Sequence, residues 1–314
     1  MNIPIAFISQ VSQESQNAWL EAIKKALPKE DILSYDNLTE AQRGIVDLAI
    51  VADPDPKKLK SLPALKWVQS LWAGVEKMTA QLGDVPFKLV RLEDPEMALK
   101  MAEAVVAWVL YLHRDMPLYA HQQRQKIWKE QKHTRAGGRH IGLIGLGHLG
   151  KEAAMALLRQ HFEVSGWSRS QKKIDGMICY AGEDGLLDML SKVDIAVCLI
   201  PLTSQTRHLI NQERLNAMPA GAQIINFARS GIMDMDALLT VLDQGHIKHA
   251  VLDVFDKEPL PSSSPLWSHS GVTVLPHISG PTNLETASQI VAKNIQHYRA
   301  TNEIPDCVDM VRGY

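Results

Sequence analysis

A glycine-rich segment between an apolar run and a helical pattern is the feature that most constrains the fold of this chain. The apolar run 141–144 leads directly into Gly145-Leu146-Gly147-His148-Leu149-Gly150, and a helical pattern follows from about residue 151 to 159. Glycines at this spacing allow a tight turn, close approach of a ligand to the backbone, and packing of helix against strand. The segment therefore predicts a parallel βα unit whose helix N-terminus binds the pyrophosphate of a dinucleotide.

Short apolar runs alternate with helical patterns along the whole chain, and this alternation is typical of α/β proteins with parallel sheets. In the first block we expect strands at residues 3–8, 47–51, 66–71 and 87–92. In the second block we expect strands at 141–144, 164–167, 195–200, 223–227, 250–255 and 272–275. A long helix is expected over about 96–114, opened by Pro95 at its first position.

The length of 314 residues exceeds the usual size of a single core, so two domains are expected. The last helix opens at Thr282-Asn283-Leu284-Glu285, a capping-box pattern, and leads the chain back towards its first block. We therefore expect a discontinuous substrate domain of residues 1–98 and 284–314. A dinucleotide-binding domain of residues 99–283 would be inserted into it.

Three polar residues follow apolar runs of the second block: Arg229, Glu258 and His277. In an open parallel sheet the carboxyl ends of the strands converge on one crevice, where ligands bind. A cation, a carboxylate and an imidazole in that crevice make an acid/base site that can also hold an anion. Taken singly, each of the three could equally be an ordinary residue at the end of a strand or in a turn.

The residues after the second expected strand of this block indicate which dinucleotide is preferred. NAD enzymes place a carboxylate there to bind the ribose 2′-hydroxyl, but this chain has Ser168 and Arg169 and no carboxylate before Asp175. A hydroxyl and a guanidinium suit a 2′-phosphate, so we expect NADPH to be preferred, with NADH possible. The alternative is that Arg169, Lys172 and Lys173 are solvated loop charges.

The bulk composition narrows the class of protein further. A net charge of −2 gives no global attraction to nucleic acid or to an anionic membrane. The longest apolar stretch, residues 104–112, is too short to cross a bilayer, and the N-terminus has no basic segment of the signal-peptide kind. Three scattered cysteines without C-x-x-C spacing suit a reducing, cytoplasmic setting and offer no metal site. Cys198 is expected to be a buried core residue.

The sequence resembles the D-isomer-specific 2-hydroxyacid dehydrogenases, and within them most closely the A-type glyoxylate/hydroxypyruvate reductases. The resemblance spans essentially the whole chain. It rests on the glycine segment 142–150, on Pro201-Leu202-Thr203 with Thr206-Arg207, on Asn226-Phe227-Ala228-Arg229, on Leu252-Asp253-Val254-Phe255 with Glu258-Pro259, and on Pro276-His277. It implies an α/β fold with two Rossmann-like or flavodoxin-like doubly wound parallel-sheet domains.

The resemblance also implies roles for individual residues. His277 would protonate the keto oxygen, Glu258 would orient His277, and Arg229 would bind the substrate carboxylate. The cofactor would be bound by Gly145, Gly147, His148, Leu149, Gly150, Ser168, Arg169, Pro201, Thr206, Phe227, Ala228 and Asp253, the last beside the nicotinamide. The backbone of the loop Trp72, Ala73, Gly74 and Val75 would bind the substrate carboxylate.

The implied activity is NADPH-dependent reduction of glyoxylate to glycolate and of hydroxypyruvate to D-glycerate, and the implied assembly is a homodimer. A dehydrogenase for another 2-keto acid, or a non-catalytic dinucleotide sensor, are the alternatives. Two residues depart from the family pattern: Ser230 replaces the usual glycine after the arginine, and Trp72 replaces a glycine of the carboxylate loop. An indole at position 72 would narrow the pocket and favour short substrates.

Overall fold

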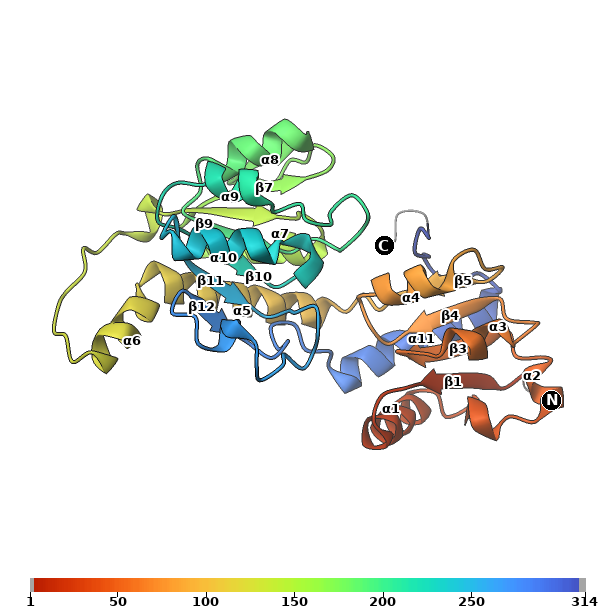
Figure 1. Cartoon of the computed structure of the whole chain (residues 1–314). Coiled ribbons are helices and arrows are strands. Elements are labelled where there is room, and N and C mark those ends of the chain that lie inside the picture. The colour runs from red at the N-terminus through yellow and green to blue at the C-terminus, as the bar shows by residue number, and fades with distance from the viewer. Residues whose placement is uncertain (1–2, 311–314) are drawn as a thin grey trace. The chain divides into compact units, whose positions relative to one another are not determined.

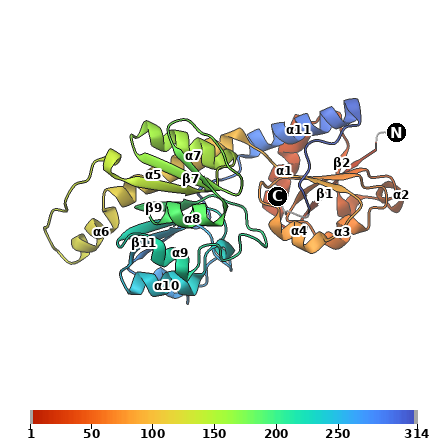
Figure 2. The same ribbon diagram turned by 90° about the horizontal axis from the view of Figure 1, so that it is seen from above.

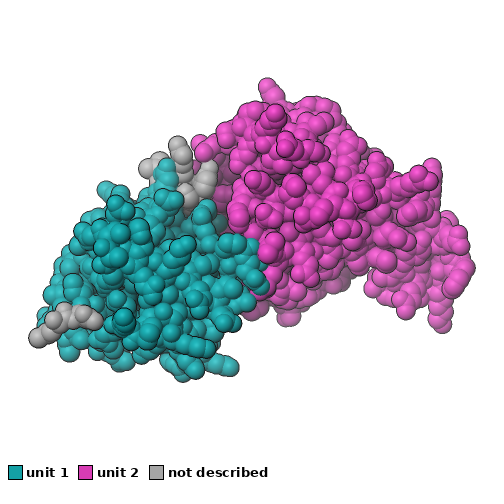
Figure 3. Space-filling model, turned by 180° about the vertical axis from the view of Figure 1, so that it is seen from behind, with its two compact units in different colours: residues 1–96, 282–314 teal, residues 97–281 magenta. Residues whose placement is uncertain are grey.

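The computed structural model describes residues 3–310, which form two α/β units (Figure 1). Unit 1 comprises Met1–Glu96 and Thr282–Tyr314, and unit 2 comprises Met97–Pro281 (Figure 3). Unit 2 is therefore an insertion in the sequence of unit 1. The two crossings lie after residues 96 and 281, and the boundaries expected from the sequence, after 98 and 283, are two residues later in each case.

Unit 1 contains a five-stranded sheet in which all neighbouring strands are parallel, in the order β2-β1-β3-β4-β5. This is the flavodoxin-like order, in which strands are added on both sides of the first one. The strands are β1 (Ile5–Ser9), β2 (Ile32–Ser34), β3 (Leu48–Ala52), β4 (Trp67–Ser70) and β5 (Lys88–Val90).

Helices cover both faces of this sheet (Figure 2). They are α1 (Gln13–Ala26), α2 (Glu40–Arg43), α3 (Pro56–Lys60), α4 (Glu76–Leu82) and α11 (Leu284–Thr301). Strand side chains alternate between the two faces, and those of Ala6, Ala49 and Val68 pack with residues of α3 and α4. On the other face, Trp67 meets Tyr298 of α11 edge-on, with ring centroids 5.4 Å apart.

The helix α11 returns the chain to unit 1 and is fixed there by polar contacts with the sheet. Asn294 donates from Nδ2 to Oε1 of Gln69 at 2.9 Å. The Tyr298 hydroxyl donates to Oδ2 of Asp47 at 2.9 Å, and Nη1 of Arg299 donates to both oxygens of Asp47. These contacts explain why residues near the end of the sequence belong to the N-terminal unit.

Unit 2 contains a seven-stranded sheet, again parallel throughout, in the order β12-β11-β10-β9-β6-β7-β8. The strands are β6 (His140–Ile144), β7 (Glu163–Ser168), β8 (Ile178–Ala181), β9 (Ile195–Cys198), β10 (Ala222–Asn226), β11 (Ile247–Leu252) and β12 (Val272–Val274). The order reverses between β6 and β9, and ligands of doubly wound folds bind outside the strand ends at such a switch point.

Helices cover both faces of the sheet of unit 2, namely α5 (Pro95–His113), α7 (His148–Arg159), α8 (Gly182–Leu190), α9 (Gln212–Ala217) and α10 (Met235–Asp243). The helix α6 (Met116–Arg124) lies away from the sheet (Figure 1). Buried residues of α5 and α7 pack on one face, and those of α8, α9 and α10 pack on the other. No helix within residues 3–310 has the length and apolarity needed to span a bilayer.

The expected α/β fold with two doubly wound parallel sheets is confirmed, and so is the start of α5 at Pro95. Two edge strands, β2 and β8, were not predicted from the sequence. The predicted capping box at Thr282 was wrong: the N-cap of α11 is Asn283, whose side chain accepts from the backbone N–H groups of Glu285 and Thr286. An Asn cap serves the helix equally well.

Candidate active site

The three polar residues singled out by the sequence follow three neighbouring strands. Arg229 comes three residues after β10, Glu258 lies in the connection after β11, and His277 comes three residues after β12. Because β10, β11 and β12 are adjacent and parallel, all three connections leave from the same edge of the sheet. The fold therefore brings a cation, a carboxylate and an imidazole to one edge of unit 2.

His277 and Glu258 form a hydrogen-bonded pair. Nδ1 of His277 lies 2.8 Å from Oε2 of Glu258, and Oε1 of the same carboxylate accepts from the backbone N–H of Phe255 at 2.8 Å. Both carboxylate oxygens thus have a partner, which fixes the plane of the carboxylate. The imidazole side chain is half exposed, at 50%, and its Nε2 is the ring nitrogen opposite the Glu258 contact. This geometry suits an acid/base whose tautomer is set by the carboxylate.

A second carboxylate holds the backbone around His277. His277 has a φ of 55°, in the left-handed region that non-glycine residues rarely adopt. The next two backbone N–H groups, of Ile278 and Ser279, donate to the two oxygens of Asp253 at 2.8 and 2.9 Å. Asp253 is only 1% exposed, and the two N–H groups take the place of the water that its carboxylate has lost. The sequence suggested a place beside the nicotinamide for Asp253, but not this contact with the His277 turn.

The backbone of Arg229 is braced by the buried side chain of Asn226. Nδ2 of Asn226 donates to the carbonyl oxygen of Arg229 at 3.0 Å, and its Oδ1 accepts from the N–H of Ala228 at 3.1 Å. Nη1 of Arg229 donates to the carbonyl of Ala228 at 2.7 Å. Asn226 is fully buried at the end of β10, directly after Ile224 and Ile225. This buried polar residue is the sequence signal that could have indicated the brace.

The glycine segment after β6 has the geometry of a phosphate-binding turn. Gly145 has a φ of 111°, and a Cβ there would lie 2.6 Å from Cγ2 of Ile200. A Cβ at Gly150 would overlap the carbonyl oxygen of Gly145, so the start of α7 packs directly on the turn. Gly147, the N-cap of α7, has open space at its Cβ position and no side-chain cap. The first N–H groups of a twelve-residue helix are thus available to an anion.

The residues expected to bind the adenosine end of the cofactor lie at the end of β7, next to the glycine strand. Ser168 is the last residue of β7, and its hydroxyl donates to the carbonyl of Ser170 at 2.8 Å. Arg169 follows it and is exposed. Lys172, for which a solvated loop charge was the alternative interpretation, donates from Nζ to the carbonyl oxygen of Leu146 in the glycine segment at 2.6 Å. Its ammonium is therefore held at the glycine segment.

The connections after β9 and β10 are braced from within. The Thr206 hydroxyl donates to the carbonyl of Pro201 at 2.8 Å and accepts from the N–H of Thr203 at 2.7 Å. The N–H groups of Phe227 and Ala228 already donate to Cys198 and Asn226. Any backbone contact with a cofactor at 227–228 would therefore go through carbonyl oxygens.

The expected carboxylate loop of unit 1 follows β4. The N–H of Trp72 donates to Oγ of Ser70 at 3.0 Å, so an anion at this loop would be bound by the N–H groups of Ala73, Gly74 and Val75. The indole of Trp72 packs edge-on against Trp19, with ring centroids 5.8 Å apart and an interplanar angle of 81°. Its orientation is thereby fixed within unit 1.

Comparison with known proteins decides the family. Residues 106–279 match the family model described as D-isomer specific 2-hydroxyacid dehydrogenase, NAD binding domain. The chain belongs to the D-isomer specific 2-hydroxyacid dehydrogenase family. Over 302 residues it is 39% identical to glyoxylate/hydroxypyruvate reductase A of Yersinia enterocolitica serotype O:8, covering 94% of this chain and 96% of that protein.

Solved structures of other 2-hydroxyacid dehydrogenases share the fold over the whole chain. A family member from Xanthobacter autotrophicus Py2, in complex with NADPH and MES, is 37% identical with a TM-score of 0.91 and 100% coverage of both chains. The NADPH-dependent glyoxylate/hydroxypyruvate reductase from Sinorhizobium meliloti, in complex with NADP and sulfate, is 28% identical with a TM-score of 0.89 and 99% coverage of both.

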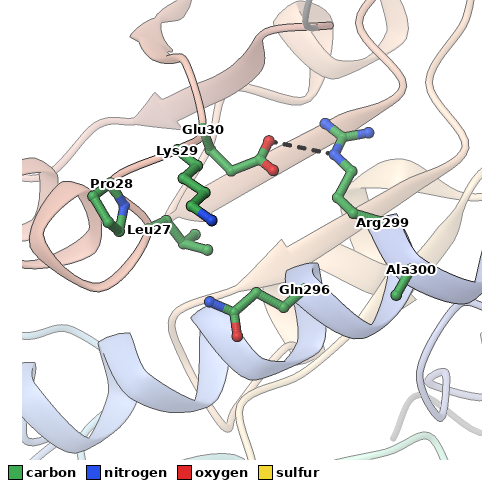
Figure 4. A pocket seen from close by; sticks show the side chains of 7 residues that line it. All are labelled: Leu27, Pro28, Lys29, Glu30, Gln296, Arg299 and Ala300. Atoms are coloured by element: carbon green, nitrogen blue, oxygen red, sulfur yellow. Dashed lines mark hydrogen bonds and ion pairs between the residues drawn. The ribbon is translucent and has the colours of Figure 1, made fainter.

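Two other features of this dehydrogenase lie outside the candidate site. A surface pocket of unit 1 is lined by the ion pair of Arg299 and Glu30 and by Leu27, Pro28, Lys29, Gln296 and Ala300 (Figure 4). Its residues 27–30 precede β2, at the opposite end of the sheet from the Trp72 loop.

Cys198 is fully buried, as expected, and burial raises the pKa of its thiol to about 12. Across residues 3–310 no three His, Cys, Asp or Glu side chains cluster as metal ligands.

Proposed function

We propose that this protein is an oxidoreductase that reduces small 2-keto acids with NADPH, converting glyoxylate to glycolate and hydroxypyruvate to D-glycerate. The observation that carries the proposal is the hydrogen-bonded pair of His277 and Glu258. This pair lies at the same edge of the sheet as Arg229 and the glycine segment, because all of them follow the carboxyl ends of parallel strands. A proton donor, an anion-binding cation and a dinucleotide-binding turn are the three parts that this reaction needs. The relatives named for this activity support the proposal.

Proton transfer is assigned to His277. The reduction adds a hydride to the carbonyl carbon of the keto acid and a proton to its oxygen. With Nδ1 donating to Glu258, Nε2 is the atom that carries the proton to the substrate oxygen. In the reverse direction the same nitrogen takes the proton from the hydroxyl. Glu258 keeps the ring in one tautomer and one orientation, since its two oxygens are fixed by His277 and Phe255.

Substrate binding is assigned to Arg229 and to the loop of Trp72, Ala73, Gly74 and Val75. A guanidinium can pair with a carboxylate through two parallel N–H groups, and it also polarises a neighbouring carbonyl oxygen. The Asn226 brace holds the backbone from which Arg229 extends. The N–H groups of residues 73–75 are the donors that the loop of unit 1 itself offers to a carboxylate.

The residues of unit 2 fit NADPH. Gly147 leaves open space over the uncapped start of α7, where a pyrophosphate would be bound by backbone N–H groups. Ser168, Arg169 and Lys172 offer a hydroxyl and two cations to a 2′-phosphate. His148, Leu149, Pro201, Thr206, Phe227 and Ala228 would line the remainder, and Asp253 would lie near the nicotinamide. When bound, the dinucleotide supplies the hydride.

The test is the initial rate of NADPH oxidation with glyoxylate and with hydroxypyruvate, repeated with NADH. Fast turnover that prefers NADPH is expected. Turnover that prefers NADH would refute the cofactor assignment and leave the chemistry in place. Dinucleotide binding without turnover of either acid would refute the substrate assignment, and a panel of longer 2-keto acids would then distinguish another dehydrogenase from a dinucleotide sensor.

We also propose that the protein forms a homodimer through unit 2 and is located in the cytoplasm. The segment from α6 to residue 128 exposes several large apolar side chains, namely Met116, Tyr119, Ile127 and Trp128. Trp128 is 99% exposed, which is unusual for an indole and typical of a residue that a partner covers. Light scattering should give about twice the mass of the 34.9 kDa chain, and Trp128→Ser together with Ile127→Ser should shift it towards the monomer.

A further inference from the structure

The residue after Arg229 makes a contact that the family resemblance does not account for. Ser230 stands where the family usually has glycine, and its hydroxyl donates to Oδ1 of Asp256 at 2.7 Å. Ser230 is 7% exposed, so its hydroxyl has lost most of its access to water. A buried hydroxyl without a partner would be costly, and a carboxylate is the strongest acceptor among side chains.

This hydrogen bond joins two connections that carry different parts of the candidate site. Ser230 lies in the connection after β10, next to Arg229, and begins a short 3₁₀ turn, Ser230–Ile232. Asp256 lies in the connection after β11, inside the turn that Glu258 closes by accepting from the N–H of Phe255. The contact therefore links the backbone that carries Arg229 to the turn that carries the partner of His277.

Each of the two connections is also held by hydrogen bonds to residues close to it in the sequence. The carbonyl of Arg229 is bound by Asn226, and the carbonyl of Ser230 accepts from the N–H of Met233 at 2.9 Å. Glu258 is bound to Phe255 and His277. These contacts fix each connection internally. They do not hold one connection against the other, so without a further bond only the paired strands β10 and β11 would set the distance between them. The bond from Ser230 to Asp256 acts beyond the strand ends, at the level of the functional side chains.

We infer that Ser230 and Asp256 are positioning residues that set the placement of Arg229 relative to the Glu258–His277 pair. The inference rests on the proposed function, in which Arg229 holds the substrate carboxylate while His277 delivers the proton. Small displacements between such groups lower the rate of the chemical step more than they weaken binding, because the reacting atoms must meet within a narrow range of distance and direction. Neither residue touches the reacting atoms in this assignment.

The test is a set of variants assayed for glyoxylate reduction with NADPH: Ser230→Ala, Ser230→Thr, Asp256→Ala, Asp256→Asn and the double variant Ser230→Ala/Asp256→Ala. Ser230→Thr keeps the hydroxyl, and Asp256→Asn keeps an acceptor oxygen. Thr273→Val is the matched control, because it removes a side-chain hydrogen bond at 2.8 Å to His249 between two strands of the same sheet. The Kd of NADPH and the melting temperature are measured for each protein.

For Ser230→Ala and Asp256→Ala we expect kcat to fall about tenfold, the effect of losing one hydrogen bond to a charged group, with KM for glyoxylate within about twofold. The double variant should fall no further, because each single change already breaks the pair. Ser230→Thr and Asp256→Asn should stay within about threefold of the wild type, and the Kd of NADPH should be unchanged in all. Thr273→Val should leave kcat unchanged whatever it does to the melting temperature.

Other outcomes overturn the inference. If Ser230→Ala lowers only the melting temperature and leaves kcat and KM unchanged, the bond is merely structural. If the double variant loses about a hundredfold, the two residues act independently. A wild-type protein that turns over neither keto acid would refute the proposed function, and this inference with it. An active wild type with an unaffected Ser230→Ala would refute the inference alone.

Discussion

His277 is held by two separate carboxylates, of which Glu258 binds its Nδ1 at 2.8 Å and Asp253 binds the backbone that follows it. The side chain of His277 and the backbone next to it are thus fixed from two positions, five residues apart, in the same connection after β11. This double hold explains how a non-glycine residue remains in the left-handed region, with a φ of 55°. It also separates the two contributions experimentally, because each carboxylate can be changed alone.

Replacement of His277 by Ala should abolish most of the turnover. General acid catalysis contributes about 10²- to 10⁴-fold, so kcat should fall by that amount while the Kd of NADPH stays within about twofold. The measurement is steady-state kinetics together with fluorescence titration of NADPH. His161→Ala is the matched control, because His161 is also exposed and has a positive φ, of 63°, in the same unit. Undiminished turnover in His277→Ala would show that another group delivers the proton.

Replacement of Asp253 by Asn should weaken the hold on the His277 turn. The Asn side chain has one acceptor oxygen, so the N–H of Ile278 or of Ser279 would lose its partner. We expect kcat to fall about tenfold or more, the cost of one unmade bond to a buried charged group. The measurement compares kcat with KM for NADPH. A rise in KM for NADPH at unchanged kcat would instead place the role of Asp253 at the nicotinamide.

Replacement of Lys172 by Ala should raise the KM of NADPH and leave that of NADH unchanged. Loss of one charge-assisted hydrogen bond to a 2′-phosphate should weaken NADPH by roughly tenfold. Lys173→Ala is the control, since it removes a neighbouring cation outside the contact between Lys172 and Leu146. Equal effects of the two changes would show that only the summed loop charge matters. Arg169→Ala should reduce the preference for NADPH in the same direction.

Replacement of Trp72 by Gly should widen the range of substrates. The edge-on contact with Trp19 holds the indole in one orientation, so the side chain cannot turn away to admit a larger substrate. Its removal should therefore enlarge the space beside the loop. We expect kcat/KM for 2-ketobutyrate relative to glyoxylate to rise about tenfold, the discrimination typical of one or two methylene groups in a pocket. Trp19→Phe, which keeps an aromatic partner, should change this ratio little. An unchanged ratio in Trp72→Gly would remove Trp72 from the specificity argument.

Replacement of Tyr298 by Phe should destabilise unit 1 by about 1 kcal/mol, because the hydroxyl bond to Asp47 is lost in a buried place. Burial, and then the bond to Asp47, raises the pKa of Tyr298 to about 12, above the ordinary value of 10. The raised pKa means that the fold favours the protonated phenol. This contribution is therefore complete below pH 10 and is lost as the pH rises through 12. Thermal denaturation of both proteins at pH 8 measures the difference, and equal melting temperatures would contradict it.

The strands in the interior of each sheet could be predicted from the sequence because they are continuous apolar runs. The edge strands β5 and β12 were predicted, but β2 and β8 were not. Strand β2 offers only two apolar residues, Ile32 and Leu33. An edge strand is stabilised by its single neighbour and needs no apolar pattern of its own.

The residues proposed for the candidate site could be singled out from the sequence, because Arg229, Glu258 and His277 each follow an apolar run. The contacts that hold them were not. Ser230 and Asp256 are 26 positions apart, and their hydrogen bond depends on the course of two irregular connections. No periodicity encodes such a course. Lys172 illustrates the same limit: its charge was visible, but its contact with Leu146 depends on how the chain folds after β7.

The return of α11 to unit 1 has a consequence for the order in which the protein is made. Asp47 and Gln69 are synthesised more than 200 residues before the side chains that bind them, which are those of Tyr298, Arg299 and Asn294. Residues 97–281 can form their own core while synthesis continues, but the first 96 residues lack the helix that covers part of one sheet face until α11 has been translated. The N-terminal sheet is therefore finished second.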